Sequence, residues 1–207
     1  NALVLGNRFF RNGGDDSGDL AFSMMNSRNY EVGFNEIYGT GTPNGSGADC
    51  ADPDVCDDYQ GTDGWTVDAK YECGVNFHHN RIYNHAPNGE NGSDGDGTDL
   101  KRVKCSDNPI RIHHNDYFGQ ASAHITLHQG ASGVEISNNI IRDGQAQGIL
   151  FQAGQECSSE HDNGHLKNFL IKNNEIRDND GDGILMKHVG SSLCVSENIS
   201  HPEPMTG

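Results

Sequence analysis

The chain has 207 residues, a formal net charge of −16, 33% hydrophobic residues and 27 glycines. This charge excludes ordinary nucleic-acid binding, because neutralising phosphates requires a basic face, and it also disfavours anionic membranes. The sequence contains no apolar run of membrane-spanning length, so we expect no membrane insertion.

One eight-residue pattern recurs along the chain: apolar, any, apolar, any, any, Asn, any, apolar. The shortest spacing between copies, from Asn115 to Asn139, is 24 residues, about the length of one coil of a parallel β-helix. Internal repeats indicate stacked units that share a continuous core. The pattern predicts one all-β domain over residues 1–207, a parallel β-helix of about seven coils with loop insertions. The copies centre on Asn7, Asn35, Asn80, Asn115, Asn139, Asn174 and, weakly, Asn198.

The largest departure from the repeat is an insertion at about residues 39–71. In repeat proteins such insertions gather on one face, which is often the binding face. Tyr59 is therefore a candidate for stacking on a sugar ring. Trp65 could stack in the same way, but its alignment with Ile149 favours burial in the core.

Acidic, glycine-rich turns precede the second strand of several coils. Asp63 and Asp96 occupy equivalent positions in successive copies, and carboxylates on adjacent turns suit Ca²⁺, which takes six to eight oxygen ligands. Asp-Gly pairs are also typical of turns with positive φ, so a purely structural role stays open. The candidate metal ligands are Asp63, Asp94, Asp96 and Asp99.

A second short strand follows the Asn pattern in the best copies, as in residues 148–151. Strand alternation sends Ile149 inward and Gln152 outward. Because stacked strands pair in register, the outward residues of successive coils should form a row. That row contains Ser23, Asp68, Lys101, His128, Gln152 and Lys187.

An acid, an amine and an imidazole in one row predict a catalytic arrangement of Asp68, Lys101 and His128. The alternative is an ordinary solvated face with mixed charges. The candidates for substrate contacts from the same strands are His124, Gln152 and Lys187.

The repeated asparagines are expected to stack at a bend, with each amide bonding to the next along the column. His78-His79 and His113-His114 each directly precede such an asparagine, so we also expect structural stacks of imidazoles. His124 and His128 remain the better candidates for acid or base.

Six cysteines form an even set without the paired spacing of a zinc site. Disulfides in an oxidising compartment, and hence a secreted protein, are the favoured interpretation. Fifteen pairings are possible. Pairs that would close a small loop or join neighbouring coils are Cys50–Cys56, Cys73–Cys105 and Cys157–Cys194.

The repeats resemble those of right-handed parallel β-helix proteins, the group that contains pectate lyases, chondroitinase- and alginate-lyase-type enzymes and alginate epimerases. The resemblance covers essentially the whole chain and implies a single-stranded right-handed coil. The segments Asp63-Gly64-Trp65 and Asp96-Gly97…Lys101 look like the calcium-carrying segments of family-9-type pectate lyases. Thr62 and Thr66 stand where two further aspartates of that family's cluster would be.

The resemblance implies a secreted enzyme that cleaves an acidic polysaccharide by β-elimination. Ca²⁺ would bridge the uronate and the protein carboxylates, and Lys101 is the first candidate for the base. A non-catalytic carbohydrate-binding module, adhesin or fibre segment is the competing class, and an epimerase or hydrolase is a third. Because the chain begins inside a repeat at Ala2, we also expect further coils or a partner chain at an end.

Overall fold

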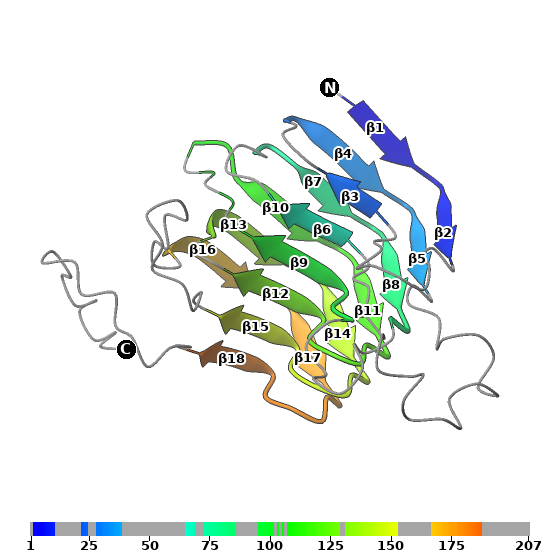
Figure 1. The fold of residues 1–207 in the computed structure, drawn as a ribbon, viewed down its shortest axis with the longest axis vertical. Coiled ribbons are helices and arrows are strands. Elements are labelled where there is room, and N and C mark those ends of the chain that lie inside the picture. Colours follow the sequence, from blue (N-terminus) through cyan, green and yellow to red (C-terminus); the bar gives the residue numbers. More distant parts are fainter. Residues whose placement is uncertain are drawn as a thin grey trace, which may run out of the picture.

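The computed structural model describes residues 2–10, 22–24, 28–38, 65–68, 73–85, 95–101, 103, 105, 107–128, 131–152 and 167–187. Residues 22–24 and 65–68, together with Lys167 and Lys187, are described by their backbone alone. Within this part the protein is all-β, with 18 strands and no helix. The strands form three six-stranded sheets in which every pairing is parallel, as in a parallel β-helix (Figure 1). None of the described segments is a helix able to cross a membrane.

Each sheet takes every third strand of the chain. The first sheet contains β1 (Ala2–Leu5), β4 (Tyr30–Gly33), β7 (Asn76–His78), β10 (Ile110–His113), β13 (Ser132–Ser137) and β16 (Lys167–Lys172). The second contains β2 (Arg8–Phe10), β5 (Glu36–Tyr38), β8 (Arg81–Tyr83), β11 (Asp116–Phe118), β14 (Ile140–Arg142) and β17 (Glu175–Arg177). The third contains β3 (Phe22–Met24), β6 (Trp65–Asp68), β9 (Thr98–Lys101), β12 (Ile125–His128), β15 (Ile149–Gln152) and β18 (Ile184–Lys187).

The apolar positions of the repeat form columns along the stack. In the first sheet Val32, Phe77, Ile112 and Ile136 pair in register, and all four are fully buried. A coil alone could not bury these side chains, but stacking covers each one from above and below. Narrow apolar columns of this kind explain how a chain with 33% hydrophobic residues forms a core.

The predicted asparagine ladder is confirmed between Asn7 and Asn174. Asn115 is typical: its amide Nδ2 donates to Asn139 Oδ1 at 3.0 Å and to the Phe77 carbonyl at 3.1 Å. Its own Oδ1 accepts from the backbone and side-chain nitrogens of Asn80 at 2.9 and 3.0 Å. These amides satisfy each other and the backbone at the bend, so they are structural. The weak seventh copy, around Asn198, lies outside the described residues.

The residue before each ladder asparagine adopts a left-handed backbone conformation. The φ angles are 57° at Phe34, 52° at His79, 55° at His114 and 54° at Asn138. This conformation is uncommon outside glycine, although Asn and His tolerate it better than most residues. The bend between the first and second strands therefore recurs with one backbone geometry in successive coils.

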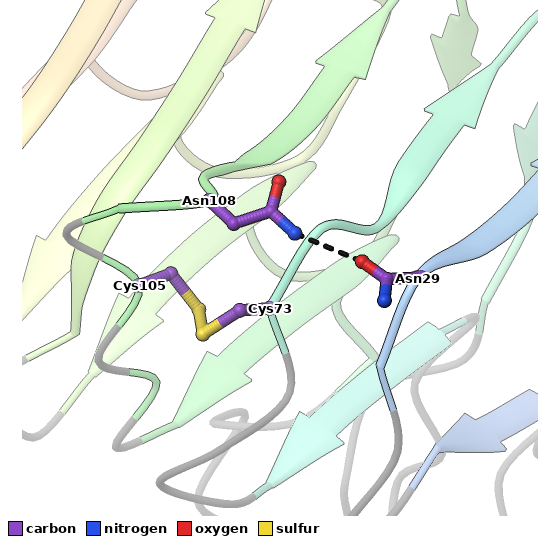
Figure 2. The surroundings of a disulfide bond; sticks show 4 residues. All are labelled: Asn29, Cys73, Cys105 and Asn108. Atoms are coloured by element: carbon purple, nitrogen blue, oxygen red, sulfur yellow. Dashed lines mark hydrogen bonds between the residues drawn. A yellow bond between two sulfur atoms is a disulfide. The ribbon is translucent and has the colours of Figure 1, made fainter.

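A disulfide joins Cys73 to Cys105, as one of the predicted pairings has it (Figure 2). Their Cα atoms are 5.2 Å apart and 32 residues separate them in sequence, so the bond links neighbouring coils just before β7 and β10. Beside it, Asn108 Nδ2 donates to Asn29 Oδ1 at 2.9 Å. The other four cysteines, and the predicted insertion at 39–71 apart from β6, lie outside the described residues.

Candidate functional site

The predicted row of outward residues exists on the third sheet. Register pairs Asp68 with Lys101, Lys101 with His128, His128 with Gln152, and Gln152 with Lys187. Coils in such a stack are about 4.8 Å apart, so consecutive members are neighbours. We call these five residues the acid–base row. Only the backbone is described for Asp68 and Lys187.

Ser23 does not belong to this row, contrary to the sequence prediction. It pairs with Thr66, two positions before Asp68. The same register pairs Phe22 with Trp65 and Met24 with Val67. Trp65 itself aligns in register with Thr98, a fully buried residue of the next coil.

Asp99 lies at the centre of the face that carries the acid–base row. Its Oδ2 is 2.7 Å from Lys101 Nζ, and its Oδ1 is 3.5 Å from His128 Nε2. Strand alternation places Lys101 on the same side of β9 as Asp99, and register places His128 beside Lys101. The Asp99 side chain is 3% exposed, against 30% for Lys101 and 20% for His128. A buried carboxylate therefore supports two more accessible basic groups.

Two of the four predicted metal ligands also meet here. One donor atom each from Asp96, Asp99 and His128 lie within 4.8 Å of one another. Carboxylate oxygens suit Ca²⁺, whereas the imidazole is a ligand typical of transition metals. Thr126, which pairs with Asp99 one coil away, has a buried hydroxyl without a hydrogen-bond partner among the described residues. Its oxygen is a further donor that faces the same side of the sheet.

The structural role of the acidic turn is also confirmed. Gly95 adopts φ of 99°, a conformation that side chains rarely take. A Cβ atom at Gly97 would lie 2.6 Å from the His124 carbonyl oxygen, so only glycine allows this approach between coils. The glycines thus shape the turn, and Asp96 is buried between them at 3% exposure.

His124 lies inside the coil rather than on the outer face. It is fully buried just before β12, and its Nε2 is 2.9 Å from Asn179 Oδ1. Burial lowers the pKa of His124 to about 4. A neutral, buried imidazole cannot touch a polymer in this conformation, so its predicted role as a substrate contact does not fit its position. Its contact with Asn179, 55 residues away, is structural.

The remaining predicted site residues divide into two groups. Gln152 is partly exposed and lies beside His128 in the acid–base row, as a substrate contact should. The others lie outside the described residues, and they are Tyr59, Asp63 and Asp94.

The outer face of the second sheet carries a ladder of stacked aromatic rings, which has a structural role. Consecutive centroids along this ladder are 5.5, 4.8 and 4.6 Å apart, with the rings nearly parallel. Arg81 lies over two of the rings, at 5.6 and 5.4 Å from their centroids. Because the inner rings cover one another's faces, they cannot stack on a sugar. The ladder consists of Phe10, Tyr38, Tyr83 and Phe118.

No family model matches the chain, and neither a curated protein nor a solved structure does so. The functional argument therefore depends on the geometry of the third sheet. The sequence analysis did not predict two features of this face. They are the contacts of Asp99 with Lys101 and His128, and the Thr126 hydroxyl as a further oxygen donor. Spacing by two residues from Lys101 and His128 was the signal that could have identified both.

Proposed function

We propose that the outer face of the third sheet binds an acidic polysaccharide and cleaves it by Ca²⁺-assisted β-elimination. The observation that carries this proposal is the Asp99 carboxylate between Lys101 and His128, with Asp96 beside it. It combines a place for a cation, a positive side chain and a proton acceptor on one flat face. The same face continues to Gln152, so a polymer could extend along the row.

The finer fold assignment belongs to the same proposal. We infer that the chain winds as a single right-handed coil, because crossovers between parallel strands of one sheet are right-handed in about 98% of cases. We also propose that the protein is secreted. The Cys73–Cys105 disulfide supports this location, since such bonds persist in oxidising compartments.

The charge of the chain makes a cation necessary for such a substrate. A uronate polymer would be repelled by a protein of net charge −16 unless positive groups intervened. Asp96 and Asp99 would hold Ca²⁺, with the Thr126 hydroxyl as a further oxygen and with water and the uronate completing its shell. When bound, the cation supplies charge neutralisation of the uronate carboxylate, which makes the proton at C5 more acidic.

Lys101 suits a different role from the base predicted for it. Its ammonium is in an ion pair with Asp99, and an adjacent carboxylate favours the charged form of an amine. A charged ammonium cannot accept a proton, but it can bind a uronate carboxylate and stabilise the developing enolate. We therefore assign substrate binding and charge stabilisation to Lys101.

His128 is the better candidate for the base. Its imidazole is partly exposed, and the Asp99 carboxylate near its Nε2 would stabilise the imidazolium that forms. In this reaction the C5 proton passes to His128. The electron pair of the C5–H bond forms the C4–C5 double bond as the C4–O bond breaks, and the leaving oxygen takes a proton from water.

A non-catalytic glycan-binding module is the second candidate. The Lys101–Asp99 ion pair favours it, because a fixed ammonium beside His128, with Gln152 one coil further along the row, is suited to bind a carboxylated sugar without any reaction. Under this alternative the polymer binds to the same face, and no bond breaks.

Incubation with polygalacturonate, alginate and chondroitin sulfate, each with Ca²⁺ or a chelator, separates the two candidates. We expect ultraviolet absorbance from an unsaturated uronate product on at least one polymer, in the Ca²⁺ arm. His128→Ala should lower kcat by about 100-fold or more, whereas Lys101→Ala should both raise KM and lower kcat. Binding without product on every polymer would support the module, and neither binding nor product would refute both functions.

A further inference from the structure

Four histidines on the first sheet form a compact group, which we call the histidine tetrad: His78, His79, His113 and His114. The stacks predicted from their register are confirmed. His78 stacks on His113 with centroids 5.3 Å apart, and His79 stacks on His114 at 5.1 Å. The tetrad is therefore two histidine pairs, one from each of two neighbouring coils.

Within each pair the Nδ1 atoms of the two rings face one another. The Nδ1 atoms of His78 and His79 are 2.9 Å apart, and those of His113 and His114 are 2.8 Å apart. The left-handed backbone at His79 and His114 turns the second ring of each pair against the first. Two coils thus repeat one arrangement of facing nitrogens.

The outer nitrogen of each pair's first ring determines its tautomer. His78 Nε2 is 3.1 Å from Glu31 Oε1, and His113 Nε2 is 2.7 Å from Asn76 Oδ1. Both partners are acceptors, so the Nε2 atoms carry the hydrogens and the Nδ1 atoms carry lone pairs. Ligand histidines in metal sites are commonly held in this way, with the second ring nitrogen donating to a carboxylate or carbonyl oxygen.

We propose that the histidine tetrad is a transition-metal site in which the two Nδ1 atoms of a pair bind Cu²⁺ or Ni²⁺, with the ion to one side of the line that joins them. Imidazole nitrogens bind such ions at about 2.0 Å, and two of them at a right angle would be about 2.8 Å apart. The observed separations of 2.9 and 2.8 Å, which the hydrogen bond between the two rings now sets, already equal the separation that two adjacent ligands of a tetragonal ion require. A tetrahedral Zn²⁺ would need a separation of about 3.3 Å.

A change of tautomer in the second ring of each pair would free its Nδ1 for the metal. The second ring of each pair now donates its Nδ1 hydrogen to the first, and this hydrogen would move to the second ring's Nε2 when the metal binds. His79 and His114 are exposed, so water can accept the relocated N–H.

One tight ion per tetrad is the expected stoichiometry. The two pairs lie one coil apart, at ring separations of 5.1 to 5.3 Å, so a first divalent ion repels a second. The Glu31 carboxylate makes the His78–His79 pair the preferred position. This site is on the first sheet and is separate from the acid–base row on the third.

Calorimetric titration with CuSO₄, combined with electron paramagnetic resonance, tests the proposal on the whole chain. We expect one tight equivalent of Cu²⁺ with nitrogen hyperfine coupling. His79→Asn with His114→Asn should weaken binding by at least about tenfold, as second-shell losses alone reach 10- to 100-fold. Asparagine preserves the fold, because Asn138 and Asn173 already occupy the same position, with φ of 54° and 55°, in the next coils.

His128→Asn is the matched control, because it removes the histidine of the other donor group and should leave the tight equivalent unchanged. The proposal is overturned if the wild-type chain shows no tight Cu²⁺ or Ni²⁺ binding, or if the double variant binds like the wild type. Loss of the tight equivalent in His128→Asn alone would also overturn it, since the ion would then lie on the third sheet.

Discussion

Replacing Asn115 by alanine should strongly destabilise the fold. The side chain is buried at 2% exposure and connects two neighbours in the ladder, Asn80 and Asn139, with the Phe77 carbonyl. Without it, the backbone N–H of Asn80, the Asn80 amide and the Phe77 carbonyl each lose a partner in the interior. A buried group left unsatisfied costs about 1 to 3 kcal/mol, so the free energy of unfolding should fall by about 3 kcal/mol or more.

Asn7→Ala is the matched control. Asn7 is exposed, and its amide donates to Asn35 Oδ1 at 3.1 Å in a partly buried bond and to the Leu5 carbonyl at 3.1 Å in an exposed one. Its loss should cost no more than about 1 kcal/mol. Urea unfolding followed by circular dichroism measures both variants. Equal losses at Asn7 and Asn115 would refute the claim that buried amide stacking stabilises the coil.

Three further predictions concern stability. The unfolded chain binds a proton on His124 below about pH 6.5, whereas the folded pKa of about 4 delays protonation, so stability should fall as pH decreases across this window. His124→Gln should make that decline shallower by about 1.4 kcal/mol per pH unit, and an unchanged slope in urea titrations would contradict this. Gly133→Ala should lower the free energy of unfolding by more than about 2 kcal/mol, since φ is 72° and the new Cβ would collide with the Cys105 carbonyl. Gly6→Ala is the control, because its Cβ would meet no atom within 4 Å. Equal urea midpoints for the two variants would contradict this prediction. Reducing the Cys73–Cys105 bond, which closes a 32-residue loop, should cost about 4 kcal/mol in the same assay, and no change would show that the bond is dispensable.

The regular part of the fold could be predicted from the sequence because its cause is local and repeated. An asparagine at fixed distance from two apolar residues produces the same bend in each coil, and strand alternation then assigns each side chain to a face. Register followed from these positions for Lys101, His128 and Gln152. It failed for Ser23, because the strand there follows no repeat pattern, and Ser23 aligns with Thr66 instead of Asp68.

The details of the candidate site were harder to predict, because they depend on contacts between coils. His124 was predicted as a substrate contact, but it is fully buried, and its partner Asn179 is 55 residues away in the chain. Asp99 was predicted only as a metal ligand, and its contacts with Lys101 and His128 depend on side-chain geometry as well as alternation. The histidine stacks were predicted, but the facing nitrogens required the left-handed backbone at His79.

The central claim is that Asp99 organises a cation-dependent elimination site on the third sheet. Its most direct test compares wild-type protein with Asp99→Asn, measuring the rate of unsaturated uronate formation with Ca²⁺ and with a chelator. The account predicts product from the wild type only in the presence of Ca²⁺, and a rate for Asp99→Asn at least about 100-fold lower. Equal rates for the two proteins, or no Ca²⁺-dependent product from the wild type on any uronate polymer, would contradict it.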